Sequence, residues 1–475
     1  MERIWKRAED KNVATRVIYI NPDESTGSAY AYKDSAYTIK MQTSELKNAI
    51  IKRAVVKMSD KILVPVSLTI ADGVATVLTM DVDNVFSFIS VKDSVGTTPD
   101  EPNDPKPVDP MTLHYLTFTS KTDDFTLNAG NKTWDGTVEY STDTENWTEW
   151  DGTSNISSVS KKLYLRGKNN TKFSKLVAGS NVGPGFIFKG PTYDTDFSTV
   201  QFDCFGNINT LLNYENPPVA IGDKCFTGFF TGTDIVTPPV LPATTLGEFC
   251  YQEMFKNCTS LTQAPELPAT TLKYDCYNGM FQGCTSLTQA PELPATTLKS
   301  ECYNGMFQGC TSLTTAPELP ATTLEDNCYA GMFKGCTSLT AAPELPATTL
   351  VGSCYKQMFQ GCTSLVTAPA LPATTLVGSC YNQMFQGCTS LATAPALPAT
   401  TLATYCYEWM FKDCTSLKVS ATQTGEYTTA WRIPTAGTAT EATDWNKDML
   451  ANTGGTFTSD PTLGTTYYIA VTPAA

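Results

Sequence analysis

The chain has 475 residues, 41% of them hydrophobic and 17% charged, which is the composition of folded domains and not of a disordered chain. Its 33 Lys and Arg against 47 Asp and Glu give a net charge of −14, which disfavours a nucleic-acid-binding protein. A single histidine, His114, argues against catalysis or metal binding that needs several imidazoles. Apolar runs of about 18 residues are missing, so no membrane insertion is expected.

Residues 1–95 are predicted to form a small α+β domain. A β-branched run at residues 15–20 indicates a strand, and residues 43–52, which begin with a capping hydroxyl, indicate a short helix. The segment 63–80 predicts a hairpin of two strands, at 63–70 and 74–80, because Asp72-Gly73 favours a tight turn between them.

The charge of the first block differs from that of the whole chain. Residues 1–61 carry 12 Lys and Arg against 8 Asp and Glu, which gives +4. This excess is either an ordinary solvated surface or a face that docks on an acidic partner. The first residues also lack the continuous apolar stretch of a signal peptide, so the product is expected to stay in the cytosol of the cell that makes it.

The first block resembles the N-terminal attachment domains of phage virion fibre proteins, especially the head fibres of crAss-like phages. The resemblance lies in Ser44-Glu45-Leu46-Lys47-Asn48-Ala49-Ile50 and in the strands at 62–66 and 72–77. It implies that residues 1–95 attach the protein to a phage capsid or to another virion protein.

A spacer and an all-β module are expected next. Residues 96–110 hold five prolines within 12 residues, with acids between them, which predicts an extended, semi-rigid linker. Residues 111–200 are predicted to form a β-sandwich-like module, with strands at 116–119 and 162–166 and a hairpin over 138–147.

Three tryptophans gather in this module, namely Trp134, Trp147 and Trp150. Exposed rings of this kind stack on sugar faces, but rings of a small sandwich more often pack in its core. Trp147 and Trp150 are therefore candidate binding residues, with core packing as the competing interpretation.

The second half of the chain is an internal repeat. The string Leu-Pro-Ala-Thr-Thr-Leu recurs at a constant interval of 26 residues, starting at Leu241, Leu267, Leu293, Leu319, Leu345, Leu371 and Leu397. A fixed period of this length predicts a solenoid, in which each unit buries its apolar face against its neighbours. We place the solenoid at 241–417, a degenerate capping repeat at 201–240 and a C-terminal cap at 418–475.

One repeat is predicted to contain a short helix and a strand. On a helix the apolar residues Cys302, Tyr303, Met306, Phe307 and Cys310 fall within an arc of about 140°, which suits packing on a sheet. The β-branched stretch at residues 311–316 predicts the strand that follows. The predicted fold class is thus multidomain, with an α/β solenoid after the α+β and all-β parts.

These repeats resemble the BspA-type leucine-rich repeats. The matching residues are Phe307-Gln308-Gly309-Cys310-Thr311-Ser312-Leu313, followed by Leu319-Pro320. The resemblance implies a leucine-rich-repeat-like solenoid and a surface protein that binds other proteins, host matrix or glycans. The module at 111–200 is similar to the β-modules that precede such repeats in bacterial surface proteins.

Fourteen of the 16 cysteines belong to the repeats, in pairs eight residues apart such as Cys302 and Cys310. Eight residues along a helix span about 12 Å, beyond the roughly 7 Å that a disulfide bridges, so a bond within one repeat is excluded. Zinc ligands usually lie two to four residues apart. Buried reduced thiols are the favoured interpretation.

The surface of the repeats offers two further candidates for binding. One acid in each of four consecutive units forms a regular series, which ends at Ala370 and Ala396 in the next two. It is either a solvated ladder or a stripe for a cation or a basic partner: Glu266, Glu292, Glu318 and Glu344. Trp409 stands where most other units carry Gly or Gln, so it should face solvent. Constant residues such as Met306, Cys310 and Leu313 should form the packed face.

Together these features favour a non-enzymatic structural and adhesion protein, a phage head fibre on the virion surface that is synthesised in the bacterial host cytoplasm. Its repeats would bind a host-surface or mucosal glycan or protein. A homo-oligomer such as a trimer is expected, with no cofactor, metal, catalytic residue or nucleic acid. The alternatives are a bacterial cell-surface BspA-like adhesin and a phage tail fibre or receptor-binding protein. A depolymerase-type enzyme is disfavoured because no acid/base pair stands out.

Overall fold

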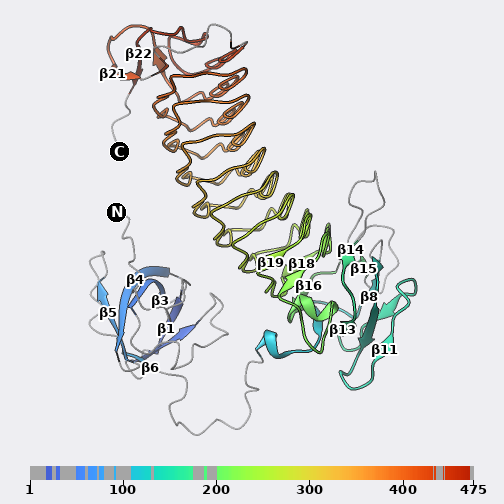
Figure 1. Cartoon of the computed structure of the whole chain (residues 1–475). Helices are drawn as coiled ribbons and strands as arrows, with labels where there is room; N and C mark the ends of the chain where they lie inside the picture. Colours follow the sequence, from blue (N-terminus) through green and yellow to red (C-terminus); the bar gives the residue numbers. More distant parts are fainter. Residues whose placement is uncertain are drawn as a thin grey trace. The chain divides into compact units, whose positions relative to one another are not determined.

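The computed structural model describes residues 109–129, 133–174, 187–189, 200–431, 433–434, 442 and 444–470, and the backbone of six strands between residues 18 and 92. The chain divides into two compact units, Met1–Asp109 and Pro110–Ala475 (Figure 1). Each unit is described by itself below.

The first unit contains six paired strands: β1 (Ile18–Asp23), β2 (Ser28–Tyr32), β3 (Ile50–Met58), β4 (Ile62–Ala71), β5 (Val74–Thr79) and β6 (Ser90–Lys92). The pairing order is β1-β2-β6-β5-β4-β3, and β1 also pairs in parallel with β3. The antiparallel β4–β5 pair confirms the predicted hairpin.

The helix predicted at residues 43–52 is wrong over its last three residues, which lie in β3. The rest of that segment lies outside the described residues, and the described part of this unit holds strands without a helix. The β-branched residues of Ile50–Met58 explain the difference, because they favour an extended strand, which pairs with β4.

The second unit begins with an all-β module, as predicted. After a short 3₁₀ turn, η2 (Pro110–Thr112), it contains β7 (Leu116–Ser120), β8 (Thr126–Asn128), β9 (Thr133–Trp134), β10 (Thr137–Ser141), β11 (Thr148–Glu149), β12 (Ile156–Ser157), β13 (Lys162–Lys168), β14 (Phe173–Ser174) and β15 (Ile187–Lys189). The main sheet has the order β11-β10-β13-β7-β16-β18, and small sheets β12-β8-β15 and β14-β9 accompany it.

The main sheet joins the module to the repeats. Its strands β16 (Phe202–Phe205) and β18 (Ile235–Thr237) lie beyond the predicted boundary at residue 200, and β16 pairs with both β7 and β18. The 3₁₀ helix η3 (Ile208–Leu211) and the parallel pair of β17 (Ala220–Ile221) and β19 (Thr245–Leu246) complete the junction.

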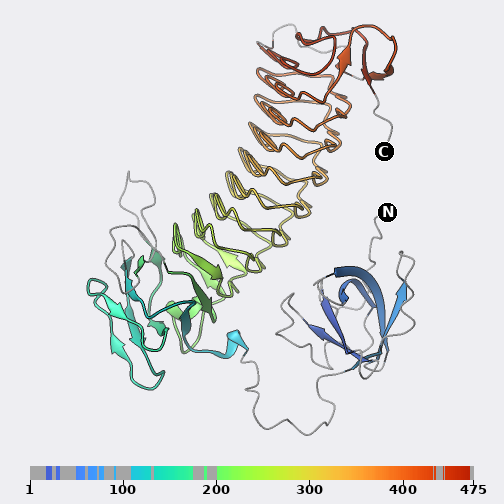
Figure 2. The same ribbon diagram turned by 180° about the vertical axis from the view of Figure 1, so that it is seen from behind.

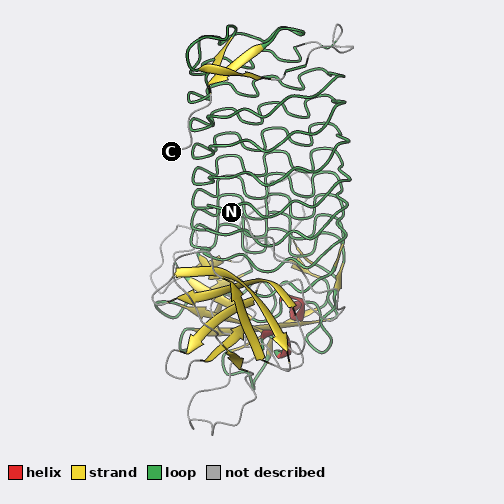
Figure 3. Cartoon of the chain, turned by 90° about the vertical axis from the view of Figure 1, so that its left-hand side faces the viewer, coloured by secondary structure: helices red, strands yellow, loops and turns green. Residues whose placement is uncertain are grey.

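Each 26-residue repeat forms one coil, and the coils stack in register (Figures 1 and 3). Isolated parallel bridges join equivalent residues of neighbouring coils, such as Thr271 with Thr297 and Thr297 with Thr323. The expected stacking at this period is therefore present. The helix and the strand predicted inside each repeat are wrong, because the described repeat residues form turns and single bridges instead.

A row of tight turns replaces the predicted helix, and we call it the turn row. In the third coil, left-handed φ angles recur at every fourth residue: 59° at Glu301, 57° at Gly305 and 76° at Gly309. Alternate N–H groups bond within the coil, as from Met306 to the Tyr303 carbonyl. The groups between them bond to the next coil, as from Gly305 to the Ala330 carbonyl at 2.8 Å.

This division of donors explains why no helix forms. A helix would satisfy every N–H within its own segment, whereas here half of the N–H groups of the turn row need the neighbouring coil. A single coil would therefore have these donors bonded only to water and would leave its apolar side chains exposed, so it gains neither the inter-coil bonds nor the burial. The turn rows are stable only as a stack.

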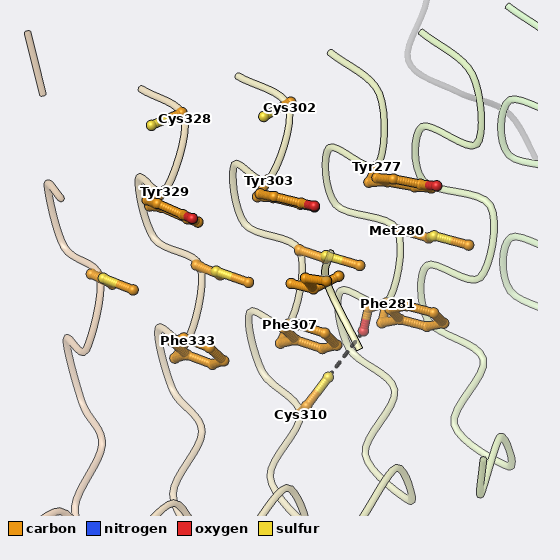
Figure 4. Packing of buried hydrophobic residues seen from close by; sticks show 14 of the residues in the cluster. Tyr277, Met280, Phe281, Cys302, Tyr303, Phe307, Cys310, Cys328, Tyr329 and Phe333 are labelled. Carbon is orange, nitrogen blue, oxygen red and sulfur yellow. Dashed lines mark hydrogen bonds between the residues drawn. The ribbon is translucent and has the colours of Figure 1, made fainter. Parts of the chain in front are cut away.

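The side chains that point inward from the turn rows form continuous columns (Figure 4). The ring centroids of Tyr303 and Tyr329 lie 5.8 Å apart, and those of Phe307 and Phe333 lie 5.7 Å apart, with planes within 10° of parallel. Met306, Cys310 and Leu313 are fully buried, which confirms the predicted packed face.

Degenerate turn rows close both ends of the stack (Figure 2). At the N-terminal end, residues 222–233 form such a row, and the Phe226 N–H donates to the Phe173 carbonyl of β14. At the C-terminal end, residues 444–453 accept bonds from the last repeat, for example from Tyr407 to Trp445. A small sheet of β20 (Val419–Ser420), β22 (Tyr467–Ala470) and β21 (Tyr427–Trp431) lies beside it.

Candidate binding surface

The outer side of the turn rows is where the repeats differ from one another, and we call it the turn-row surface. It comprises positions 247–249, 252–253 and 256–257 of the first repeat and their equivalents at 26-residue intervals. Most of these residues are partly or fully exposed. The constant residues between them point inward. Each turn row therefore has an inward side that is the same in every repeat and an outward side that differs between repeats.

The remaining part of each coil forms a second surface, which we call the threonine side. It carries the exposed hydroxyls of residues such as Thr311, Thr322 and Thr323, repeated in the other coils. Its stacking follows the parallel bridges, so equivalent residues lie about 4.8 Å apart. This side varies much less than the turn-row surface.

The four acids predicted as a ladder lie on the threonine side. Each is exposed and directly precedes the Leu-Pro pair of the next repeat: Glu266, Glu292, Glu318 and Glu344. They occupy equivalent positions of consecutive coils, so the structure brings them into one column. They lie away from the predicted tryptophans, and the acids and the rings do not form a common site.

Trp409 lies on the turn-row surface of the last repeat and is partly exposed. Its indole Nε1 donates to Asp448 Oδ2 at 3.2 Å, and the Lys412 ammonium lies 4.9 Å from its ring centroid. Its φ of 55° is left-handed, a region that bulky side chains rarely occupy. The expectation that this residue faces solvent is confirmed in part, since its indole also contacts the C-terminal row.

The two other predicted tryptophans have different surroundings. Trp150 is only 3% exposed and packs on Trp134 at a centroid distance of 5.4 Å, which favours core packing over a role in binding. Its ring fills the core of the module, as the competing interpretation held. Trp147 is partly exposed, and the Arg166 guanidinium lies 4.0 Å from its centroid.

One unusual carboxylate on the turn-row surface is absent from the sequence predictions. Asp275 is only 6% exposed, and its Oδ1 has no hydrogen-bond partner among the residues that the structure describes. Burial, together with the neighbouring Glu301 and Glu253 carboxylates, raises the pKa of this carboxyl to about 6. The sequence signal was present, because Asp275 and Glu301 occupy equivalent positions of adjacent repeats.

All 16 cysteines are free and buried, in agreement with the reduced-thiol prediction. Cys310 donates its S–H to the Phe281 carbonyl at 3.1 Å, and the equivalent bond recurs along the stack (Figure 4). Burial raises the pKa of the Cys310 thiol to about 12, so it stays protonated at neutral pH. These thiols serve as small packed donors and are poor nucleophiles.

Metal ligands and membrane spans were also sought in the part of the chain that the structure describes. No group of three or more His, Cys, Asp and Glu side chains there could hold a metal ion. None of the helices there combines the length and the apolar character needed to cross a bilayer.

The stack of short coils with constant Leu, Phe and Cys columns defines a repeat region of the leucine-rich-repeat type. The family model described as BspA type Leucine rich repeat region matches six copies in two overlapping stretches, residues 198–340 and 303–427. Residues 198–427 are therefore a BspA-type leucine-rich-repeat region, as the resemblance of Phe307-Gln308-Gly309-Cys310 predicts. Such repeats are typical of surface adhesin-type proteins. No match was found among curated proteins or among solved structures.

Proposed function

We propose that the protein is a non-enzymatic adhesion protein that binds a host-surface or mucosal glycan or protein through the turn-row surface. The observation that carries this proposal is the contrast between the two sides of each turn row. Inward columns repeat the same residues through seven coils, whereas the outward positions change from coil to coil. Packing requires the inward residues to stay the same and leaves the outward positions available for selectivity.

The variable residues supply contacts of different kinds along one rigid surface. Residues 273–275 read Lys-Tyr-Asp, residues 299–301 read Lys-Ser-Glu and residues 351–353 read Val-Gly-Ser. Tyr274 and Tyr405 each expose 38% of their surface. Partly exposed aromatic rings beside charged groups are common at the centres of binding interfaces.

The experiment uses the full chain and exchanges residues 299–301 for Val-Gly-Ser, the triplet that another coil already carries at this position. This exchange should leave the melting temperature nearly unchanged, because surface substitutions usually alter stability by about 0.5 kcal/mol or less. Wild type and variant are compared on arrays of glycans and host-surface proteins. The proposal predicts a weaker signal for the variant, and the matched control exchanges exposed threonines of the threonine side for serine.

The proposed setting is a virion, with the protein as a head fibre that attaches to the capsid through residues 1–95. This setting rests on the resemblance of that block to fibre attachment domains. Deletion of residues 1–95 should abolish co-sedimentation with virions and should preserve ligand binding. A truncated chain that still sediments with particles would refute this setting.

A bacterial cell-surface adhesin is the second candidate, because BspA-type repeats are typical of such proteins. Fractionation of the producing cells separates the two candidates. Recovery of the protein in the cell envelope favours the adhesin, and recovery in purified particles favours the fibre.

A further inference from the structure

A cluster of aromatic rings around one arginine lies on the outer face of the main sheet of the β-module. Alternation along β13 buries Leu163 and Leu165 and leaves Tyr164 and Arg166 on the other face. Glu139 of β10 lies opposite Arg166 in the antiparallel register. The module thus presents a polar and aromatic sheet face whose neighbouring strands are firmly paired.

Two residues from outside the strands enclose Arg166. Its guanidinium carbon lies 4.0 Å from the Trp147 ring centroid and 4.2 Å from the Tyr214 ring centroid. Trp147 is fixed by a bond from its Nε1 to the Thr144 carbonyl at 3.0 Å. Tyr214 is fixed through its N–H, which donates to the Gly167 carbonyl at 2.9 Å. The arginine therefore has little freedom to change its rotamer.

The hydrogen bonds of this guanidinium are incomplete within the described part of the chain. Arg166 Nε donates to Glu139 Oε2 at 2.6 Å, and the two terminal nitrogens have no partner among the described residues. The side chain is 20% exposed. A guanidinium carries five N–H donors in a fixed plane, so four donors remain on the open edge of the clamp.

The aromatic rings that adjoin Trp147 are suited to a sugar. The Tyr115 ring lies 5.7 Å from Trp147 and 5.4 Å from Tyr164, centroid to centroid, and all three side chains are partly exposed. Aromatic rings pack on the C–H faces of sugars, and phenolic hydroxyls hydrogen-bond to sugar hydroxyls. Lys168, on the same strand and 5.9 Å from the Tyr214 ring, is paired with Glu215 Oε1 at 2.5 Å, so Arg166 is the cation of this cluster that keeps unused donors.

We propose that Arg166 binds the carboxylate of an acidic sugar, a hexuronate or a related sugar acid within a glycan. Its two terminal nitrogens donate in parallel to the two carboxylate oxygens, a geometry that guanidinium groups favour. Trp147, Tyr115 and Tyr164 contact the sugar ring. This site deepens the proposed function, because it names a ligand class for the adhesion protein and a second location for binding.

The first experiment needs no variant. Full-length protein is titrated by calorimetry with an oligosaccharide that contains glucuronate and with its carboxyl-reduced counterpart, which contains glucose instead. The proposal predicts about tenfold or greater preference for the acid. Equal affinity for the two, or binding of neither, would overturn it.

The second experiment replaces Arg166 by Lys, which keeps the charge but removes the paired donors and the flat group between the two rings. Arg166→Lys should lower affinity for the acidic oligosaccharide about tenfold, and it should lower affinity for the carboxyl-reduced oligosaccharide much less, so that a general loss of packing is separated from a loss of carboxylate recognition. Retained affinity would mean that Arg166 only clamps the Tyr214 segment. The exchange of residues 299–301 serves as the control, since it tests the turn-row surface and should not affect this site.

Discussion

The turn rows of the middle coils and those near the ends of the stack share one backbone but carry different residues. In the third coil the left-handed positions are Glu301, Gly305 and Gly309, whereas in the last repeat they are Tyr405, Trp409 and Asp413. The inward columns continue unchanged through both regions. The comparison teaches that packing determines the inward side, while the outward side accepts residues that the local backbone disfavours.

The largest expected effect concerns the inward side of a middle coil. Met306→Ala should destabilise the stack locally by about 2–5 kcal/mol, because the side chain is fully buried and its removal leaves a cavity between two aromatic columns. Hydrogen exchange at residues 303–309 measures the loss as faster exchange of amides that are normally bonded to the next coil. Unchanged exchange would mean that the inward face is assigned incorrectly.

The second prediction concerns Asp275, near the N-terminal end of the stack. Its pKa is raised from 3.8 to about 6, so folding favours the protonated carboxyl, and its contribution to stability is lost as pH rises through about 6. Asp275→Asn should therefore unfold at a higher temperature than wild type at pH 7. Because a shift of one pKa unit corresponds to about 1.4 kcal/mol, the gain in free energy of unfolding is at most about 3 kcal/mol.

The pH dependence separates this effect from a general change in packing. The difference in melting temperature between Asp275→Asn and wild type should grow from pH 4 to pH 6 and then level off. Glu301→Gln is the matched control, because it removes the neighbouring carboxylate that helps to raise the pKa. A difference that does not depend on pH would contradict the assignment.

The third prediction tests the backbone of the middle coils. Gly309→Ala should cost about 1–2 kcal/mol, because φ is 76° and alanine disfavours the left-handed region. A Cβ there would lie 3.8 Å from the Gly283 Cα, an ordinary contact, so crowding adds little. Chemical denaturation of the full chain, followed by the fluorescence of the tryptophans that flank the stack, gives the change. No loss of stability would show that the φ angle carries no cost at this position.

Sequence reasoning found the inward residues of the repeats and assigned the wrong backbone to them. Cys302, Met306 and Cys310 are spaced four residues apart, and the turns have the same spacing. Over the length of one repeat, a helix and a row of four-residue turns therefore give the same pattern of apolar residues. The spacing of Gly305 and Gly309, also four, was the distinguishing signal, because a helix interior disfavours glycine and a left-handed turn favours it.

The candidate site residues were predictable only where the repeat period alone determines their position and exposure. The column of acids that includes Glu318 follows directly from the repeat period, and its exposure agrees with expectation. Trp150 and Trp147 differ in burial because one points into the module core and the other covers Arg166. That distinction depends on strand register and on a loop from residue 214, which no local pattern encodes.

The smallest expected effect concerns the last repeat. Trp409 holds a φ of 55° where the third coil has Gly305, so Trp409→Gly should relieve backbone strain and make this coil more stable by about 0.5–1 kcal/mol. The gain stays small because the indole also bonds to Asp448 and lies near Lys412. Hydrogen exchange at residues 405–413 reports it as slower local opening.

Trp409→Ala separates the backbone from the side chain in this last comparison. Alanine removes the same indole contacts but keeps a Cβ in the left-handed region, so it should leave the fold intact and exchange faster than Trp409→Gly. The difference between the two variants then measures the strain alone. If alanine protected the coil as well as glycine, the cost would lie in the indole contacts, and the end coils would not differ from the middle ones in backbone strain.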